Sequence, residues 1–314
     1  MLLVFISFSL VACNQSTVSI YSDDDPFILE TQDDTIKILQ LTDQHLMYGF
    51  GYNDQQTFAL IETLANKDDY DLIVLTGDQT MAPRTIAIYR TLIQKMEALN
   101  IPWTFVFGNH DNDFCSYESL IEAILDEETT YLMFKVGPEI VEGGYGNFKI
   151  NFTYQGEVIY HAYFLDSKNE EDHYTEEQGE YGYLSVDQVN WYENSVEQDE
   201  RESVVFMHIP LRQYMDVDES DPSFTGNFNE DKVYAQGKDT GFFQAMLDYG
   251  MSKAVFVGHD HLNDFSFIKD GILLAYGRNS GYSAYGNLQR GGRHIEIDIN
   301  QQITTYIVLG DESS

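Results

Sequence analysis

The chain has 314 residues, of which 43% are hydrophobic and 14% aromatic, so it can bury the core of one large domain. It carries 17 Lys and Arg against 52 Asp and Glu, which gives a formal net charge of −35 at pH 7. This balance argues against nucleic acid as a partner, because binding to phosphates requires clustered Lys and Arg that the sequence lacks.

The first residues have the pattern of a lipoprotein leader. Residues 1–10 form an apolar run that is too short to span a bilayer, which needs about 20 residues. The following Leu10-Val11-Ala12-Cys13 resembles the lipobox of bacterial lipoproteins. We therefore predict a signal peptide over residues 1–12, lipidation of Cys13, and an extracytoplasmic protein that is secreted or contacts the cell membrane only through this lipid.

Two features bear on this prediction. No Lys or Arg precedes the apolar run, so the start is N-terminally truncated or the run is a buried strand with an incidental cysteine. Residues 13–34 are polar and include Asp23-Asp24-Asp25-Pro26, which is typical of an acidic linker. We expect the folded domain over residues 35–314, without a disulfide, because a lipidated Cys13 leaves Cys115 without a partner.

The first half of the domain alternates strands and helices. Apolar runs at 36–41, 72–75 and 103–107 predict buried strands, and amphipathic segments at 54–66 and 86–99 predict the helices between them. Asn53 or Asp54 is placed to cap the first helix. This alternation predicts an α/β fold, in which sites collect beyond the carboxyl ends of the strands.

The second half is less regular. A helix is predicted at 116–125, strands at 147–152 and 158–165, and an acidic loop at 168–180. Ser185 and Gln188 form a capping box that opens the next helix, and Gly250 closes a helix over 240–249. Residues 204–207 and 254–257 are further buried strands, followed by hairpins over 265–276 and 294–309.

Five of the predicted strands end in a cluster of His, Asp or Asn, and five of the eight histidines of the chain belong to these clusters. Each residue has an ordinary alternative role, such as a helix cap, a turn residue or a core histidine. It is their recurrence at five strand ends that indicates a site. The clusters are Asp43 and His45, Asp78, Asn109 and His110, His208, and His259 and His261.

Imidazole and carboxylate together suit zinc and first-row transition ions, and the lack of a Cys cluster argues against a structural zinc site. One ion uses about four to six ligands. The candidate ligands are therefore too many for one ion and fit two ions that share a carboxylate.

This ordered set resembles the calcineurin-like metallophosphoesterases. The matching motifs are Asp-x-His, Gly-Asp, Gly-Asn-His-Asp, a later His and Gly-His-x-His, spread over residues 36–309. Within the superfamily, residues 208–211, 258–265 and 277–282 look most like the purple-acid-phosphatase-like branch. The resemblance implies an α/β fold with a four-layer αββα sandwich of two mixed β-sheets flanked by helices.

The resemblance also implies a role for each residue. His110 would stabilise the transition state or protonate the leaving group, and Asn109 would also contact the substrate. Asp111 would support catalysis by orienting a histidine. One metal ion would be held by Asp43, His45 and His261, the other by Asn109, His208 and His259, with Asp78 bridging two divalent or mixed-valence ions of Mn, Fe or Zn.

Two departures from the purple acid phosphatases limit the resemblance. Met81 stands where those enzymes have a tyrosine whose phenolate binds ferric iron, and His45 stands where their first motif usually has glycine. The resemblance therefore does not carry over a purple colour or an obligate ferric site. Residues 77–84 also lack the Asp-Arg-Gly continuation of the Ser/Thr protein phosphatases.

The expected function is metal-dependent hydrolysis of a small phosphate ester, either a monoester or a diester. The alternative is a catalytically silent, metal-binding surface lipoprotein. Arg278 and Arg84 are the cations nearest in sequence to the motifs, and each is a candidate either for contacting phosphate or for a surface ion pair. The Tyr-rich residues 276–285 would either line the cleft or pack beneath it.

Overall fold

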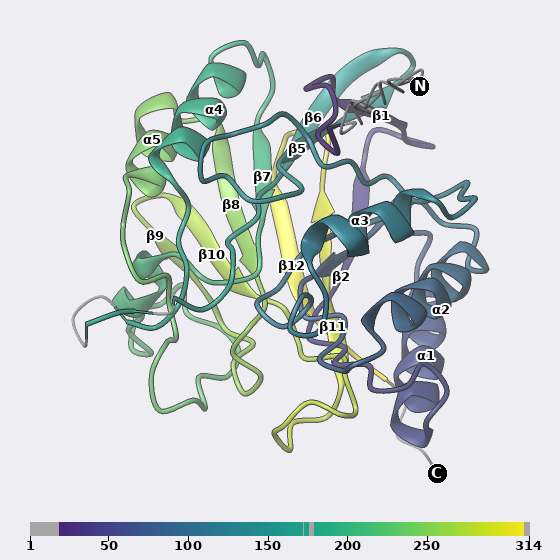
Figure 1. The fold of residues 1–314 in the computed structure, drawn as a ribbon. Coiled ribbons are helices and arrows are strands. Elements are labelled where there is room, and N and C mark those ends of the chain that lie inside the picture. The colour runs from purple at the N-terminus through teal and green to yellow at the C-terminus, as the bar shows by residue number, and fades with distance from the viewer. Residues whose placement is uncertain (1–18, 172, 176–178, 311–314) are drawn as a thin grey trace, which may run out of the picture.

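The computed structural model describes residues 19–171, 173–175 and 179–310 (Figure 1). Two mixed β-sheets pack face to face, and five α-helices in the described residues flank them, which confirms the expected four-layer α/β architecture. The predicted signal peptide over residues 1–12 and the predicted lipidation site Cys13 lie outside the described residues. Within the described residues, no helix has both the length and the apolar character needed to cross a membrane.

The five-stranded sheet carries the first half of the site. Its strands β2, β3 and β4 are parallel, and β11 and β12 extend it in antiparallel fashion beyond β2. Three helices lie on its outer side, at the right of Figure 1. In sheet order the strands are β12 (Ile303–Leu309), β11 (Gly291–Ile297), β2 (Ile36–Leu41), β3 (Leu72–Thr76) and β4 (Trp103–Val106); the helices are α1 (Tyr52–Ala65), α2 (Thr85–Glu97) and α3 (Tyr117–Leu125).

The seven-stranded sheet carries the other half. Strands β6, β7, β8 and β10 are parallel, while β5 and β9 run antiparallel to their neighbours β6 and β10. Two α-helices cover its outer face, at the left of Figure 1, and a short 3-10 helix follows β7. In sheet order the strands are β1 (Phe27–Glu30), β5 (Phe148–Tyr154), β6 (Glu157–Phe164), β7 (Ser203–Phe206), β8 (Ser252–Val257), β10 (Ile272–Tyr276) and β9 (Ser266–Lys269); the helices are α4 (Val186–Val196), α5 (Phe242–Tyr249) and the short 3-10 helix η1 (Arg212–Asp216).

Strand alternation divides the apolar side chains between two cores. On β7, Val204 and Phe206 face the core between the sheets, whereas Val205 faces the core under α4 and α5. Burying each large apolar side chain contributes about 1.5–3 kcal/mol. Phenyl rings on four neighbouring strands also stack across the inner face, with centroids 4.8, 5.3 and 5.4 Å apart, in the order Phe148, Phe164, Phe206 and Phe256.

The predicted caps are partly confirmed. Ser185 and Gln188 form the capping box of α4, and Gly250 ends α5 in a left-handed conformation. The predicted cap of α1 is wrong, because its N-cap is Gly51 without a side-chain bond. Asp54 turns back instead and accepts the N–H groups of residues 47–49 at 3.0, 2.8 and 2.7 Å, which ties down the loop that follows His45.

The acidic linker expected over residues 13–34 is wrong for its last part. Phe27–Glu30 forms strand β1, which pairs in parallel with β5. Just before it, the carboxylate of Asp24 accepts the indole N–H of Trp191 at 2.9 Å. These residues are therefore part of the folded body, in which Phe27–Glu30 is an edge strand of the seven-stranded sheet.

Candidate metal centre

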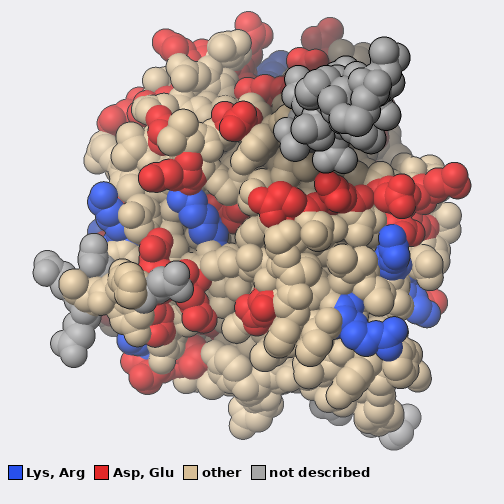
Figure 2. Space-filling view, in the orientation of Figure 1, with Lys and Arg blue, Asp and Glu red and all other residues tan. Residues whose placement is uncertain are grey.

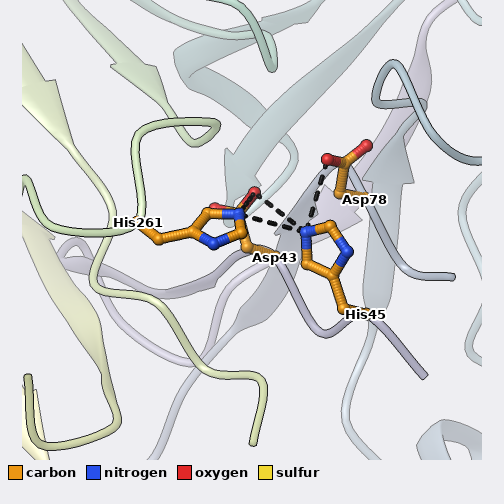
Figure 3. Close-up of side chains that lie close together, drawn as sticks. All are labelled: Asp43, His45, Asp78 and His261. Atoms are coloured by element: carbon orange, nitrogen blue, oxygen red, sulfur yellow. Dashed lines mark hydrogen bonds and ion pairs between the residues drawn. The ribbon is translucent and has the colours of Figure 1, made fainter. Parts of the chain in front are cut away.

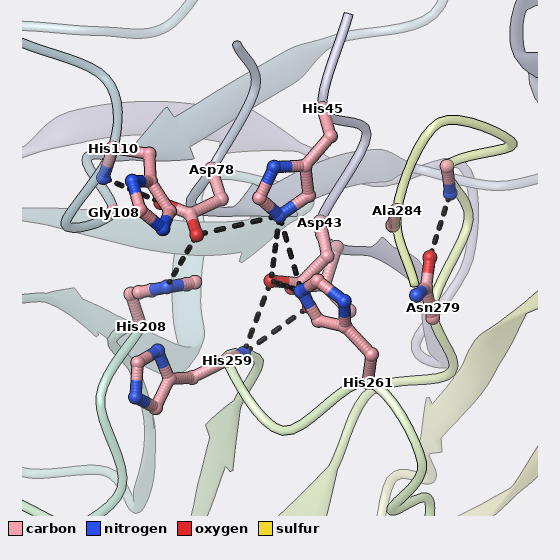
Figure 4. Close-up of polar contacts among 12 residues, drawn as sticks. Asp43, His45, Asp78, Gly108, His110, His208, His259, His261, Asn279 and Ala284 are labelled. Carbon is pink, nitrogen blue, oxygen red and sulfur yellow. Dashed lines mark hydrogen bonds and ion pairs between the residues drawn. The ribbon is translucent and has the colours of Figure 1, made fainter. Parts of the chain in front are cut away.

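The carboxyl ends of β2, β3, β4, β7 and β8 meet at one end of the two sheets, where they bring together the seven expected ligands. Figure 4 labels six of them, all except Asn109. Backbone hydrogen bonds join the loops that carry them. Asp43 N–H donates to the carbonyl of Gly77 at 3.1 Å, His45 N–H to Asp78 at 3.0 Å, and Gly258 N–H to His208 at 3.1 Å. The clusters separated in sequence thus form one site.

Four of the seven residues have a left-handed backbone. The φ angles are 55° at Asp43, 43° at His45, 53° at Asp78 and 79° at His259. Side chains other than glycine rarely adopt this region, and such conformations persist where the surrounding structure enforces them, often at functional sites. The backbone is thus bent to aim these side chains inward.

Two glycines allow the loops to approach one another. Gly77 has a φ of 91°, and a Cβ there would overlap the imidazole of His208. A Cβ on Gly108 would overlap the backbone and carboxylate of Asp78. Both motifs therefore need glycine for space, and the Gly-Asp motif also needs it for the left-handed backbone at Gly77.

The first cluster consists of Asp43, His45, Asp78 and His261, all buried, with ligand atoms within 4.8 Å of one another (Figure 3). His45 Nε2 lies 3.5 Å from Asp78 Oδ2 and 3.1 Å from His261 Nε2. His261 Nε2 also lies 3.4 Å from Asp43 Oδ1. These atoms face a common point and match the expected ligands of one ion plus the bridging carboxylate.

The second cluster consists of Asp78, His208 and His259, and it shares Asp78 with the first. His208 Nδ1 donates to the carbonyl of Thr76 at 2.7 Å, so Nε2 is the ring nitrogen that faces the cluster. That Nε2 lies 3.3 Å from Asp78 Oδ2 and 3.1 Å from Asn109 Oδ1. Asn109 thus joins this cluster, as expected for its amide oxygen.

The donor set fits two cations. Burial lowers the pKa of His45 to about 4 and that of His259 to about 3, so both are neutral imidazoles, the form that binds metal. Burial also lowers the pKa of His208, but Asp78 raises it more, to about 9, because the carboxylate favours positive charge at this position. Two buried carboxylates and several lone pairs thus converge without a Lys or Arg among the described residues that line the site.

His110 lies beside the clusters without joining them. Its N–H donates to Asp78 Oδ1 at 2.9 Å, and its ring centroid lies 5.7 Å from that of His45. Its Nδ1 lies 2.9 Å from Asp113 Oδ2. Burial lowers the pKa of His110, but the negative charges of Asp78 and Asp113 raise it more, so the pKa is above its usual value.

The expected role of Asp111 is corrected. Its Oδ2 accepts the N–H groups of Gly108 and Asp78 at 2.8 and 3.1 Å, and its Oδ1 accepts that of Thr80 at 3.1 Å. The carboxylate therefore ties the two loops together and does not orient a histidine. Asp113 contacts His110 instead, a partner that sequence reasoning missed although its spacing of three residues permits the contact.

The prediction that Arg278 contacts substrate is contradicted by its burial. Only 6% of Arg278 is exposed, its Nη1 pairs with Asp264, and its Nε donates to the carbonyl of Gln289 at 2.7 Å. Arg84 is exposed at the N-terminus of α2 and is not among the residues that line the pocket. Figure 2 shows one face of the molecule, on which Asp and Glu are spread widely and Lys and Arg occur in a few places.

A pocket of about 570 Å³ opens over both clusters. Met81 lines it, so the position at which purple acid phosphatases have a tyrosine faces the site but offers a thioether.

The Tyr-rich segment divides between the two expected roles. Tyr285 lines the pocket, whereas Tyr276 is buried and donates to Asp260 at 2.6 Å. The other lining residues are His45, Asp78, Asn109, His110, Tyr181, Glu230, Tyr234, His259, Asp260, His261, Ser283 and Ala284.

Comparison with known proteins places this geometry in a family. The model of the calcineurin-like phosphoesterases matches residues 36–263. The probable inactive purple acid phosphatase 28 of Arabidopsis thaliana is 27% identical over 87% of this chain and 78% of its own length. Phosphatase DCR2 of Saccharomyces cerevisiae is 29% identical over 87% of this chain and 53% of its own length.

A solved structure has the same fold. The dimetal phosphatase from Danio rerio superposes with a TM-score of 0.60 at 12% identity, covering 88% of this chain and 97% of that chain. With the family match over most of the domain and two buried His/Asp clusters in place, the chain belongs to the calcineurin-like phosphoesterases, and its curated relatives include purple-acid-phosphatase-like proteins.

Proposed function

We propose that the protein is a dinuclear metal-dependent hydrolase of small phosphate esters. The observation that carries this proposal is the pair of buried clusters that share Asp78 and open, beside His110, into one pocket. Two ions of the Mn, Fe or Zn type would lower the pKa of a water and neutralise the phosphate oxygens. The residues that would hold them are Asp43, His45, Asp78, Asn109, His208, His259 and His261.

Side chains of the protein would supply the proton and the hydrogen bonds to the phosphate. His110 faces the pocket, and its raised pKa favours the imidazolium form that donates a hydrogen bond or a proton to the departing oxygen. Asp113 fixes the ring through Nδ1, which leaves Nε2 for the substrate. Asn109 has its oxygen at His208 and lines the same pocket, so its amide N–H₂ group is available to the phosphate.

A catalytically silent protein that keeps its metals is the second candidate. It is favoured by the names of three Arabidopsis thaliana relatives, each called a probable inactive purple acid phosphatase. The enzyme is supported by His110 and by the seven ligand positions, because loss of activity usually removes some of these groups.

The experiment is hydrolysis of aryl phosphate monoesters and diesters by the protein loaded with Mn, Zn or Fe, with metal content measured on the same samples. We expect turnover by the natural sequence and its loss in Asp78→Asn and His110→Ala. Full metal occupancy without turnover would establish the silent protein. The ratio of monoester to diester rates assigns the subclass.

We also propose that the chain is anchored outside the cytoplasm by a lipid on Cys13. The support is the Leu-x-Ala-Cys pattern that ends at this residue. Mass measurement of the mature N-terminus tests it: an acylated chain beginning at Cys13 is expected, and an unmodified chain that retains Met1 would refute the anchor.

A further inference from the structure

Three tyrosines, Tyr181, Tyr234 and Tyr285, form part of the pocket wall. The Tyr285 ring stacks on His261 at a centroid distance of 4.1 Å and an interplanar angle of 29°. The Tyr181 ring meets His259 edge-on at 4.3 Å, and Tyr234 follows it at 6.3 Å. One ring therefore adjoins each cluster, so the organic group of a phosphate bound between the clusters would extend along these rings.

This wall offers acceptors and electron-rich rings rather than positive charge. Tyr285 donates its hydroxyl to Glu230 Oε1 at 2.7 Å, and Tyr234 donates to Asp231 at 3.0 Å, so neither proton is available to an anion. Glu230 Oε1 also accepts the N–H of Leu262 at 3.2 Å, which holds the carboxylate in the wall. No Lys or Arg occurs among the described residues that line the pocket.

One cation does lie nearby. The ammonium of Lys232 sits over the Tyr234 ring, 4.6 Å from its centroid, and Lys232 lines a neighbouring hollow rather than this pocket. This contact shows that a tyrosine ring of the wall accepts an ammonium group. Among the described residues, Tyr285, Tyr181 and Glu230 then form the part of the wall to which no lysine ammonium is bound.

We propose that this wall selects phosphate esters of a cationic alcohol, either an amino alcohol or its quaternary ammonium form, and that Glu230 and Tyr285 are the residues that select it. The inference rests on the proposed function and names the substrate class of the same site. An aromatic face beside a carboxylate is the environment that an ammonium group prefers. A second phosphate or a carboxylate on the leaving group would meet the carboxylate of Glu230 beside the hydroxyls of Tyr285 and Tyr234, whose protons are already donated.

The reaction itself is ordinary ester hydrolysis. A water oxygen forms a bond to phosphorus, the bond from phosphorus to the alcohol oxygen breaks, and the alcohol leaves with a proton as inorganic phosphate is released. The ammonium group takes no part in these bonds, so its contribution is to binding and orientation.

The experiment compares phosphocholine with 3,3-dimethylbutyl phosphate, a neutral ester of the same shape, on the Mn-loaded full chain. We expect kcat/KM for phosphocholine to be about tenfold higher. In Glu230→Gln this ratio should fall toward one, and in Tyr285→Leu it should fall as well. Glu139→Gln removes an equal charge from an exposed position outside the pocket and should keep the ratio.

The outcomes are separate from those that test the proposed function. The inference is overturned if the natural sequence hydrolyses both esters with similar kcat/KM, or if Glu230→Gln keeps the preference for phosphocholine. Hydrolysis of either ester still supports the proposed enzyme. If neither ester is hydrolysed, calorimetric titration with choline decides: binding that is lost in Glu230→Gln supports the cationic subsite, and no binding overturns it.

Discussion

His110 Nδ1 lies 2.9 Å from the carboxylate of Asp113, at the mouth of the pocket that contains the metal clusters. Burial lowers the pKa of His110, but the negative charges of Asp78 and Asp113 raise it by more than burial lowers it. Asp78 is shared by both clusters, so its charge would be largely balanced by bound ions. Asp113 then remains as the neighbouring carboxylate that favours the protonated form of His110.

Asp113→Asn should therefore lower the pKa of His110. If His110 acts as the acid, the alkaline limb of the kcat/KM profile moves to lower pH by about one unit, since a carboxylate at this distance shifts a pKa by one unit or more. The pH profile with an aryl phosphate measures this. Asp126→Asn, at an exposed position that ends α3, is the control and should leave the limb in place. If Asp113→Asn leaves the alkaline limb of the pH profile where it is, His110 is not the catalytic acid.

The sharing of Asp78 predicts unequal effects of two Asp→Asn changes. Asp43 belongs to the first cluster only, so Asp43→Asn should retain about one ion per chain, held by the second. Asp78→Asn weakens both clusters, so this variant should retain less than one ion per chain. Metal analysis after dialysis measures the stoichiometry, with about two ions expected in the natural sequence. Equal retention by both variants would contradict a bridging carboxylate.

Met81 lies in the pocket at the position where the purple acid phosphatases have a tyrosine. With ferric iron bound, Met81→Tyr should therefore gain a visible charge-transfer band from the new phenolate, and the natural sequence should lack it. The absorption spectrum measures this. Met81→Phe controls for ring size and should stay colourless. A band already present in the natural protein would mean that another tyrosine binds iron.

His161 predicts a pH dependence of stability away from the site. Burial lowers its pKa to about 4, even though Asp199 raises it, while its Nδ1 lies 2.7 Å from Asn151. Between pH 6.5 and pH 4 the unfolded chain binds a proton at this position and the folded chain does not, so stability falls as the pH falls. Between pH 6.5 and pH 4, the free energy of unfolding of the natural protein should fall by about 3 kcal/mol more than that of His161→Gln.

Urea unfolding at both pH values measures the difference. His173→Gln, at an exposed position, is the matched control and should lose as much as the natural sequence. If the His161→Gln variant is as sensitive to acid as the natural protein, the acid loss of stability arises elsewhere.

The sequence predicts the metal centre well because its signal is local. Asp43, Asp78 and His208 each follow a buried apolar strand directly, and parallel strands bring such positions to one end of a sheet. Strands and helices are also predicted well wherever an apolar period meets a capping signal, as at Ser185. The left-handed backbone at Asp43 and Asp78 has no such signal, because it arises from loops that press on each other.

The residues that were predicted wrongly depend on contacts made across the chain. Arg278 has the composition of a phosphate ligand, but it follows β10 and pairs with Asp264, which precedes β9, and this ion pair has no signal in the sequence. Phe27–Glu30 is a short apolar run inside a polar segment, too short to be identified as a strand on its own, and it pairs with β5 far along the chain. Tyr181 and Glu230 come from irregular segments, where no period indicates which side chains face the site.

The pocket wall and the metal ligands come from different parts of the chain. The ligands lie at the ends of strands that the two cores hold in place, whereas Tyr181, Glu230 and Tyr285 lie on connections between elements. Such connections tolerate replacement better than packed strands. Descendants of this chain can therefore acquire a new substrate by exchanging three surface segments while the chemistry is inherited unchanged, and a designer can do the same.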